Sequence, residues 1–231
     1  MSSRTDFRNM IGELKRKYTG NGVVPEDGTD SIVPPLSITI EDLRLARFPE
    51  RYKDATFENY RFYGTDAQKA AQGRLVECLR RGFPVVMYGN NGTGKTHLAY
   101  AAMRNQILQG KEAVYASLTD IIDEIKQGFG NNVPTARIVD KYISYDYLVI
   151  DEMDKAYGTT TEFLNIFKIV NGRYMTKLPT VLISNASKDD VMEIVGKSSF
   201  ERIGEDGIAV HMDWLSFRIR SVAKEAEKEG R

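Results

Sequence analysis

A glycine-rich segment that ends in lysine and threonine constrains the fold of this chain more than any other part of its sequence. The segment is Gly89-Asn90-Asn91-Gly92-Thr93-Gly94-Lys95-Thr96, and it matches the full P-loop pattern. The apolar run 84–88 before it predicts a buried strand, and residues 95–109 after it are predicted to form a helix. A strand, a glycine-rich turn and a helix N-terminus in this order predict a site in which backbone amides surround phosphate oxygens.

The side chains of this segment predict a nucleoside triphosphate and a magnesium ion as its ligands. Lys95 is expected to neutralise the β- and γ-phosphates, and the Thr96 hydroxyl to bind Mg²⁺. His97 follows at once, and a histidine inside that helix is more typical of a packed neighbour than of a catalyst. Backbone contacts to the phosphates are expected from the other residues of the segment, which are Gly89, Asn90, Asn91, Gly92, Thr93 and Gly94.

Polar residues at the ends of two later strands extend this prediction. The apolar residues 147–150 predict a central strand that ends at Asp151 and Glu152, where ligands bind in open α/β sheets. Asp151 is expected to hold Mg²⁺, and Glu152 to act as the general base towards an attacking water. The next strand ends at Asn185, whose amide is predicted to orient that water or contact the γ-phosphate. The alternative for Asn185 is an ordinary strand-to-loop turn.

The order of strands and helices predicts the fold class. Strands are expected at 84–88, 113–116, 147–150 and 180–184. Helices are expected at 66–81, 95–109, 118–127 and 161–174, with another ending near 143, and the turn residues between 128 and 134 are expected to break the chain. Strands that alternate with helices indicate an α/β fold with a parallel sheet covered on both faces.

Composition narrows the function classes. The chain of 231 residues has 32 Lys and Arg and 32 Asp and Glu, so its formal net charge is zero and DNA binding would have to use a local patch. A single cysteine excludes an internal disulfide, and with two histidines no zinc cluster is expected. No apolar run approaches the roughly 20 residues of a membrane span, and residues 1–17 lack a signal-peptide core. We expect a cytoplasmic protein with no membrane partner.

The first 54 residues differ from the rest. Residues 19–37 are rich in Gly, Pro, Asp and Ser and are typical of a linker, and a second short helix is predicted from Thr39. The helix before the linker either packs on the protein's own core or binds a partner. We divide the chain into an N-terminal helical segment with linker, 1–54, and an ATPase domain, 55–231. The apolar stripe of the first helix is Phe7, Met10, Ile11, Leu14 and Tyr18.

Four segments in order resemble the AAA+ ATPases of the DnaC/DnaI helicase-loader family and the related IstB transposition ATPases. The resemblance covers roughly residues 55–220 and implies an AAA+ core with Mg²⁺-dependent ATP hydrolysis, so the implied cofactors are ATP and Mg²⁺. The segments are Thr56-Phe57-Glu58-Asn59-Tyr60, Gly94-Lys95-Thr96-His97-Leu98-Ala99, Leu148-Val149-Ile150-Asp151-Glu152 and Asp213-Trp214-Leu215-Ser216-Phe217-Arg218.

The resemblance also implies roles for two arginines. Arg202, in Phe200-Glu201-Arg202-Ile203, matches the arginine finger that reaches the ATP of a neighbouring subunit, which implies a homo-oligomer assembled on the helicase with ATP. Arg218 matches the second sensor, a contact to the nucleotide of the same subunit. The alternative for each is an exposed surface arginine.

The family's single-stranded DNA channel is lined by a helical element that falls here between residues 117 and 147. This resemblance makes Lys126, Phe129 and Lys141 candidate DNA contacts, with Arg137 in the same interval and Tyr157 as a further candidate. Basic residues near an aromatic ring suit phosphate neutralisation with base stacking. The alternative is a core phenylalanine beside a solvated basic face.

The leading hypothesis is an ATP-dependent helicase loader. Its residues 1–54 would bind a hexameric DnaB-type replicative helicase, and its ATPase domain would place that helicase on single-stranded DNA at replication initiation. This resemblance implies the cytoplasm of a bacterial cell, with the protein encoded by that cell or by a bacteriophage. The alternative within the family is an IstB-like ATPase that regulates transposition on duplex DNA. A P-loop small-molecule kinase is disfavoured, because kinases seldom carry the Asp151-Glu152 pair followed by a strand that ends in asparagine. An ATP-switched adaptor with little hydrolysis is a further class, against which Glu152 argues.

Overall fold

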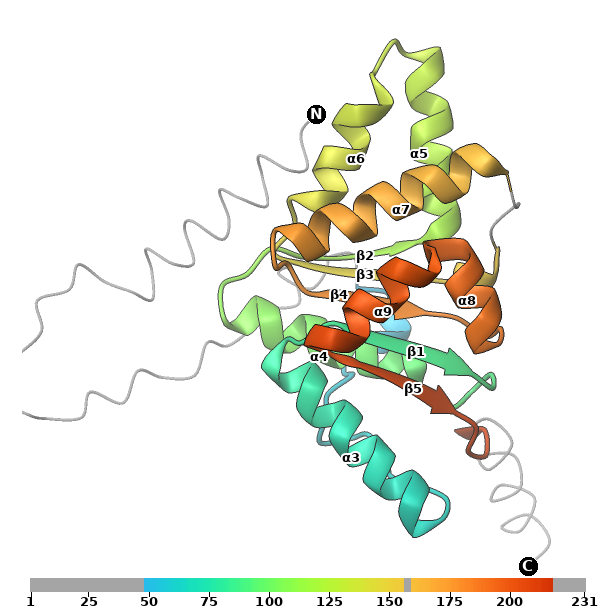
Figure 1. Ribbon diagram of the computed structural model, residues 1–231. Helices are drawn as coiled ribbons and strands as arrows, with labels where there is room; N and C mark the ends of the chain where they lie inside the picture. The colour runs from blue at the N-terminus through green and yellow to red at the C-terminus, as the bar shows by residue number, and fades with distance from the viewer. Residues whose placement is uncertain (1–47, 156–158, 218–231) are drawn as a thin grey trace, which may run out of the picture.

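The computed structural model describes residues 48–155 and 159–217 (Figure 1). The parts of the chain assigned above to the N-terminal stripe helix, the linker and the second short helix lie outside these residues, as do Tyr157 and Arg218. Within the described ranges no helix is long and apolar enough to cross a membrane. The elements in chain order are η1 (Glu50–Tyr52), α3 (Asp66–Arg81), β1 (Val85–Gly89), α4 (Lys95–Leu108), β2 (Ala113–Ser117), α5 (Leu118–Gly130), α6 (Thr135–Ile143), β3 (Tyr147–Asp151), η2 (Met153–Lys155), α7 (Thr160–Met175), β4 (Thr180–Ile183), α8 (Lys188–Val195), α9 (Lys197–Asp206) and β5 (Ile208–Met212).

The strands form one five-stranded sheet in the order β2-β3-β4-β1-β5. All four pairings are parallel, and Met87 of β1, for example, lies opposite Ile183 of β4 and Val210 of β5. The carboxyl ends of β1, β3 and β4 therefore meet at one edge of the sheet, which brings the P-loop, the acidic pair and Asn185 together. The predicted parallel α/β sheet is confirmed.

Helices cover both faces of this sheet (Figure 1). Because successive strand residues point to opposite faces, Val85 and Met87 pack with α3 and α4, whereas Val86 packs with the helices α5 to α9. Phe48 and Tyr52, before α3, pack on Tyr100 of α4 and so join the first of these clusters. The result is a three-layer molecule with a hydrophobic cluster on each side of the sheet.

The structure corrects one predicted helix boundary and contains elements that were not predicted. Gly128 was expected to break the chain, but α5 continues to Gly130. A Cβ atom on Gly128 would lie 2.7 Å from Cδ1 of Ile138, so glycine here allows α5 and α6 to approach closely. The chain turns instead at Asn131–Pro134, where Asn132 has a φ of 53°. No prediction was made for α8, α9 and β5, which are short and partly exposed.

A buried arginine joins the α5–α6 hairpin to the sheet. Arg173 of α7 is fully buried, and burial lowers its pKa to about 9. Its guanidinium is held by neutral oxygens, which suits a group whose charge is delocalised over a planar fork of donors. The acceptors are the Thr180 hydroxyl and the carbonyls of Tyr142, Ile143, Tyr145 and Pro179.

Candidate active site

The P-loop connects the end of β1 to the start of α4, as predicted. Its three glycines have left-handed φ values, 109° at Gly89, 76° at Gly92 and 98° at Gly94. A Cβ atom on Gly94 would lie 2.6 Å from the ring of Tyr60, and one on Gly89 would lie 2.9 Å from the carbonyl oxygen of Met212. Both the backbone conformation and the close packing therefore require glycine. The loop leaves the amino end of α4 open towards the pocket.

Two segments far apart in the sequence hold the P-loop in shape. The Tyr60 hydroxyl and the Trp214 indole both donate to the carbonyl oxygen of Thr93, at 3.2 Å and 3.0 Å. The backbone amide of Phe217 donates to the carbonyl oxygen of Gly92 at 2.8 Å. These contacts were not predicted from the sequence, although both segments carry the family resemblance. Local pattern gives no signal for them, because they join the two ends of the described chain.

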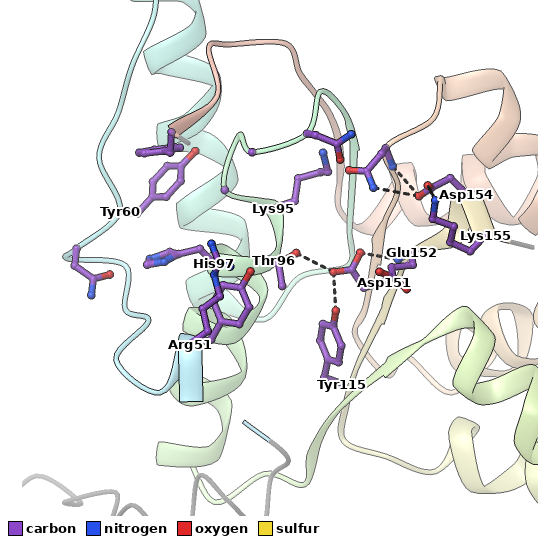
Figure 2. A pocket seen from close by; sticks show the side chains of 17 residues that line it. Arg51, Tyr60, Lys95, Thr96, His97, Tyr115, Asp151, Glu152, Asp154 and Lys155 are labelled. Atoms are coloured by element: carbon purple, nitrogen blue, oxygen red, sulfur yellow. Dashed lines mark hydrogen bonds and ion pairs between the residues drawn. The ribbon is translucent and has the colours of Figure 1, made fainter. Parts of the chain in front are cut away.

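A pocket of about 710 Å³ lies at the carboxyl edge of the sheet (Figure 2). This volume is in the range of about 300–1,000 Å³ that is usual for small-ligand sites. In Figure 2, Lys95 lies between Tyr60 on one side and the Asp151-Glu152 pair on the other. The pocket is lined by polar residues of the P-loop and of the strand ends, and also by the aromatic residues Tyr52, Tyr60, His97 and Phe217.

Lys95 is positioned inside this pocket by the P-loop itself. Its Nζ donates to the carbonyl oxygens of Gly89 and Asn90, each at 2.7 Å. Burial lowers the pKa of Lys95 to about 8, and the charges of Asp151 and Asp154 act in the opposite direction. Negatively charged phosphate oxygens are stronger partners for an ammonium group than peptide carbonyls. The arrangement is suited to binding a phosphate chain.

Asp151 and Thr96 together present a pair of hard oxygen donors. The Thr96 hydroxyl donates to Oδ2 of Asp151 at 3.0 Å, and the carboxylate is buried at the end of β3. Burial raises the pKa of Asp151, while hydrogen bonds from Tyr115, Glu152 and Thr96 lower it. Mg²⁺ in nucleotide sites takes one or two protein oxygens and completes its shell with phosphate and water. The donor set therefore fits Mg²⁺.

Glu152 and Asn185 follow β3 and β4 and both line the pocket, as the sequence predicted. Glu152 has a φ of 58°, an uncommon conformation for a non-glycine residue that is often found at functional sites. Its backbone amide donates to Oδ1 of Asp151 at 2.6 Å. Asn185 donates to Oδ1 of Asp154 through its backbone amide at 3.0 Å and its side chain at 3.4 Å. Asp154, which was not predicted, thus orients the Asn185 amide.

Tyr115 is a second residue that sequence reasoning missed. It lies on β2, lines the pocket, and its hydroxyl donates to Oδ2 of Asp151 at 2.8 Å. Burial raises the pKa of Tyr115, so its hydroxyl remains a proton donor at neutral pH. No motif marks this residue, because its contact depends on the pairing of β2 with β3.

Arg202 lies on α9 and is not among the residues that line the pocket of its own chain. Its guanidinium donates to Oδ1 of Asn171 and lies 5.3 Å from the centre of the Tyr174 ring. The side chain therefore has a defined place on the outer helices, at the surface formed with α7.

The candidate DNA contacts lie on the α5–α6 hairpin, which extends beyond the sheet (Figure 1). The Phe129 side chain is 62% exposed, so it is not a core residue. Lys126 forms an ion pair with Glu162 at 3.3 Å, and Lys141 forms one with Glu124 at 2.5 Å. The two lysines thus have carboxylate partners within the chain, which reduces the positive charge that they offer to phosphate.

Comparison with known proteins agrees with this geometry. Residues 38–224 match the family described as IstB-like ATP binding protein. The chain is 27% identical over 179 residues to the replicative helicase loader DnaC of Escherichia coli (strain K12), an alignment that covers 75% of this chain and 73% of DnaC. It is 25% identical over 186 residues to an ATP-binding protein of an insertion sequence in Mycobacterium tuberculosis, covering 77% and 72% of the two chains.

Solved structures share the fold. DnaA from Aquifex aeolicus bound to AMPPCP superposes with a TM-score of 0.59 at 24% identity, covering 76% of this chain and 55% of that one. The crystal structure of the DnaC helicase loader superposes with a TM-score of 0.58 at 19% identity, covering 71% and 100%. The family match extends over most of the chain and includes the whole pocket. The chain therefore belongs to the IstB-like ATP-binding protein family and is a P-loop ATPase with the AAA+ fold.

Proposed function

We propose that this ATPase is a replicative helicase loader, which binds a DnaB-type helicase through residues 1–54 and places it on single-stranded DNA. The observation that carries the proposal is the similarity to DnaC over three quarters of the chain, combined with a pocket suited to ATP hydrolysis. The relatives are bacterial proteins, and the proposed place of action is the bacterial cytoplasm.

The proposed hydrolysis uses the pocket residues in the following way. Lys95 and the backbone amides of the P-loop bind the phosphates, except the amide of Asn90, which donates to the carbonyl oxygen of Met212 at 2.9 Å. Arg218 would contact the same nucleotide. Thr96 and Asp151 would hold Mg²⁺, which supplies positive charge to the phosphates when bound. Glu152 takes a proton from water as the water oxygen attacks the γ-phosphorus and ADP leaves. Asn185, oriented by Asp154, directs that water.

Arg202 is proposed to complete the site of a neighbouring subunit in a homo-oligomer. Its place on α9, outside the pocket of its own chain, supports a role between subunits. A guanidinium there would stabilise the charge that develops on the phosphoryl group as the bond to ADP breaks.

Single-stranded DNA is proposed to contact Phe129 on the α5–α6 hairpin. The exposure of its ring supports base stacking. Lys126 and Lys141 are expected to contribute less to DNA binding, because each forms an ion pair with a carboxylate of the chain. Base stacking on an aromatic ring is sequence-tolerant, which suits a protein that acts wherever a helicase is loaded.

Phe129→Ala is expected to weaken binding of single-stranded DNA by about 10-fold, because a stacked base contributes about 1–3 kcal/mol. The measurement is fluorescence anisotropy of a labelled oligonucleotide with a non-hydrolysable ATP analogue present. Leu164→Ala is the matched control, since Leu164 is an exposed apolar residue of α7 outside the hairpin, and it should bind as the wild type does. Equal affinity of the two variants would remove Phe129 from the DNA site.

Removing residues 1–47 is expected to abolish helicase binding and to leave ATP affinity unchanged. The cut is made before Phe48, because Phe48 and Tyr52 pack on the core around Tyr100. The measurement is co-elution with a purified hexameric DnaB-type helicase from the same host, alongside nucleotide affinity as the test of folding. Continued co-elution of the truncated chain would contradict the role assigned to this segment.

Regulation of transposition on duplex DNA is the second candidate function. The family match and the 25% identity to an insertion-sequence protein favour it. A pull-down from host lysate with the full chain separates the two candidates, because a helicase is expected as the captured protein for a loader and a transposase for a transposition regulator. Preference for duplex over single-stranded DNA in the anisotropy measurement would also favour this second function.

A further inference from the structure

The carboxylate of Asp151 is held by three hydrogen-bond donors. The Thr96 hydroxyl and the Tyr115 hydroxyl both donate to Oδ2, at 3.0 Å and 2.8 Å, and the backbone amide of Glu152 donates to Oδ1 at 2.6 Å. Thr96 is itself expected to bind the metal, so it is part of what must be oriented. The other two donors, the Tyr115 hydroxyl and the Glu152 amide, are not proposed metal ligands, so they can orient Asp151 relative to Thr96.

The parallel pairing of β2 with β3 places Tyr115 beside Asp151. Tyr115 lies opposite Val149 in the register, and Ser117, two residues later, lies opposite Asp151. The long phenol side chain spans this offset along the strands, as the dashed line in Figure 2 shows. A serine or threonine at residue 115, whose hydroxyl is bonded directly to Cβ, would be too short to span this offset.

Ring stacking fixes the Tyr115 side chain in this orientation. The rings of Tyr115 and Tyr100 are stacked with centroids 4.8 Å apart and planes at 20°. Tyr100, which is 1% exposed, is stacked in turn on Tyr52 at 4.9 Å and 15°. Offset aromatic stacking restricts the rotation of each ring. The Tyr115 hydroxyl is therefore directed at Asp151 by packing.

We propose that Tyr115 is a positioning residue, whose hydroxyl holds the Asp151 carboxylate facing the Thr96 oxygen and so prepares the magnesium site. The proposal rests on the role of Asp151 as a metal ligand in the function proposed above. Residues that hydrogen-bond to a metal ligand typically contribute about 10–100-fold to metal affinity, because they fix the ligand's orientation before the metal binds.

Tyr115→Phe tests this, because phenylalanine keeps the stack on Tyr100 and removes only the hydroxyl. Tyr100→Phe is the matched control, since it removes a hydroxyl from the next ring of the same stack. The measurement is the binding of a fluorescent, non-hydrolysable ATP analogue, first in EDTA and then as a function of Mg²⁺ concentration. It yields the metal-free affinity and the Mg²⁺ concentration at which half of the affinity gain is reached.

For Tyr115→Phe we expect a Mg²⁺ midpoint about 10-fold higher than that of the wild type, with the affinity in EDTA unchanged. Tyr100→Phe should change neither quantity. An unchanged midpoint for Tyr115→Phe would overturn the proposal. A loss of affinity in EDTA as large as the loss in Mg²⁺ would also overturn it, because the hydroxyl would then shape the pocket and not the metal site.

Asp151→Asn separates this inference from the proposed function. If Asp151→Asn raises the midpoint and Tyr115→Phe does not, only the role of Tyr115 fails. If neither variant raises the midpoint, Asp151 is not a metal ligand, and the proposed hydrolysis chemistry fails with it. Melting temperatures of the variants show whether each is folded at the temperature of the measurement.

Discussion

Glu152→Gln is expected to lower ATP turnover by about 10²–10⁴-fold while ATP binding is retained, because general-base catalysis contributes a factor of this size. Glutamine has the same length and the same backbone requirements at the φ of 58° found here, so the pocket keeps its shape. It cannot accept a proton from the attacking water. The measurements are steady-state phosphate release and equilibrium binding of an ATP analogue.

Two controls make this prediction specific. Glu193→Gln is the same substitution on α8 at an exposed residue outside the pocket, and its turnover should equal that of the wild type. Lys95→Ala should lose nucleotide affinity itself, since it removes the ammonium group that is proposed to bind the phosphates. Full turnover in Glu152→Gln would show that another group takes the proton.

Arg202→Ala is expected to lower turnover in assembled subunits by about 10³–10⁵-fold, the range known for arginine fingers. Nucleotide binding by the single subunit should be retained, because Arg202 does not line the pocket of its own chain. Lys197→Ala, on the same helix and paired with Glu201 on the surface, is the matched control for a general disturbance of α9. Its turnover should be that of the wild type.

Mixing two inactive variants tests whether Arg202 acts between subunits. Arg202→Ala subunits bind ATP but have no finger, whereas Lys95→Ala subunits bind ATP poorly but still carry Arg202. In a mixed assembly an Arg202→Ala subunit can be completed by a Lys95→Ala neighbour, so turnover should rise well above that of either variant alone. A mixture with no more activity than the separate variants would contradict the role in trans.

Much of the fold could be predicted because its signals are local in the sequence. The helix expected at 66–81 has these bounds in the structure, since Thr65 and Gln68 form a capping box at its start and Gly82 adopts the left-handed conformation at its end. The apolar runs of β1, β3 and β4 are buried on both sides of the sheet, and buried parallel strands have this pattern. No prediction was made for residues 208–212, which form β5, because His211 interrupts their apolar run.

The candidate site likewise contains residues that local sequence patterns predict and contacts that they do not. Lys95, Thr96, Asp151, Glu152 and Asn185 could be predicted to share one pocket, because motif and strand-end position determine where such residues lie in a parallel sheet. The roles assigned to them stay predictions until the variants are measured. Lys126 shows the limit of local pattern: its basic charge is visible in the sequence, but its ion pair with Glu162 of α7 is not.

The sequence by itself determined a P-loop ATPase core, because the eight residues 89–96, the acidic pair and the alternation of strands and helices are all written over short spans. Only the tertiary structure decided how that core is supported. The order β2-β3-β4-β1-β5 brings Tyr115 to Asp151, and the packing of both ends of the described chain brings Tyr60 and Trp214 to Thr93. Such contacts depend on which segments become neighbours in the folded chain, and local sequence patterns do not determine which distant segments meet.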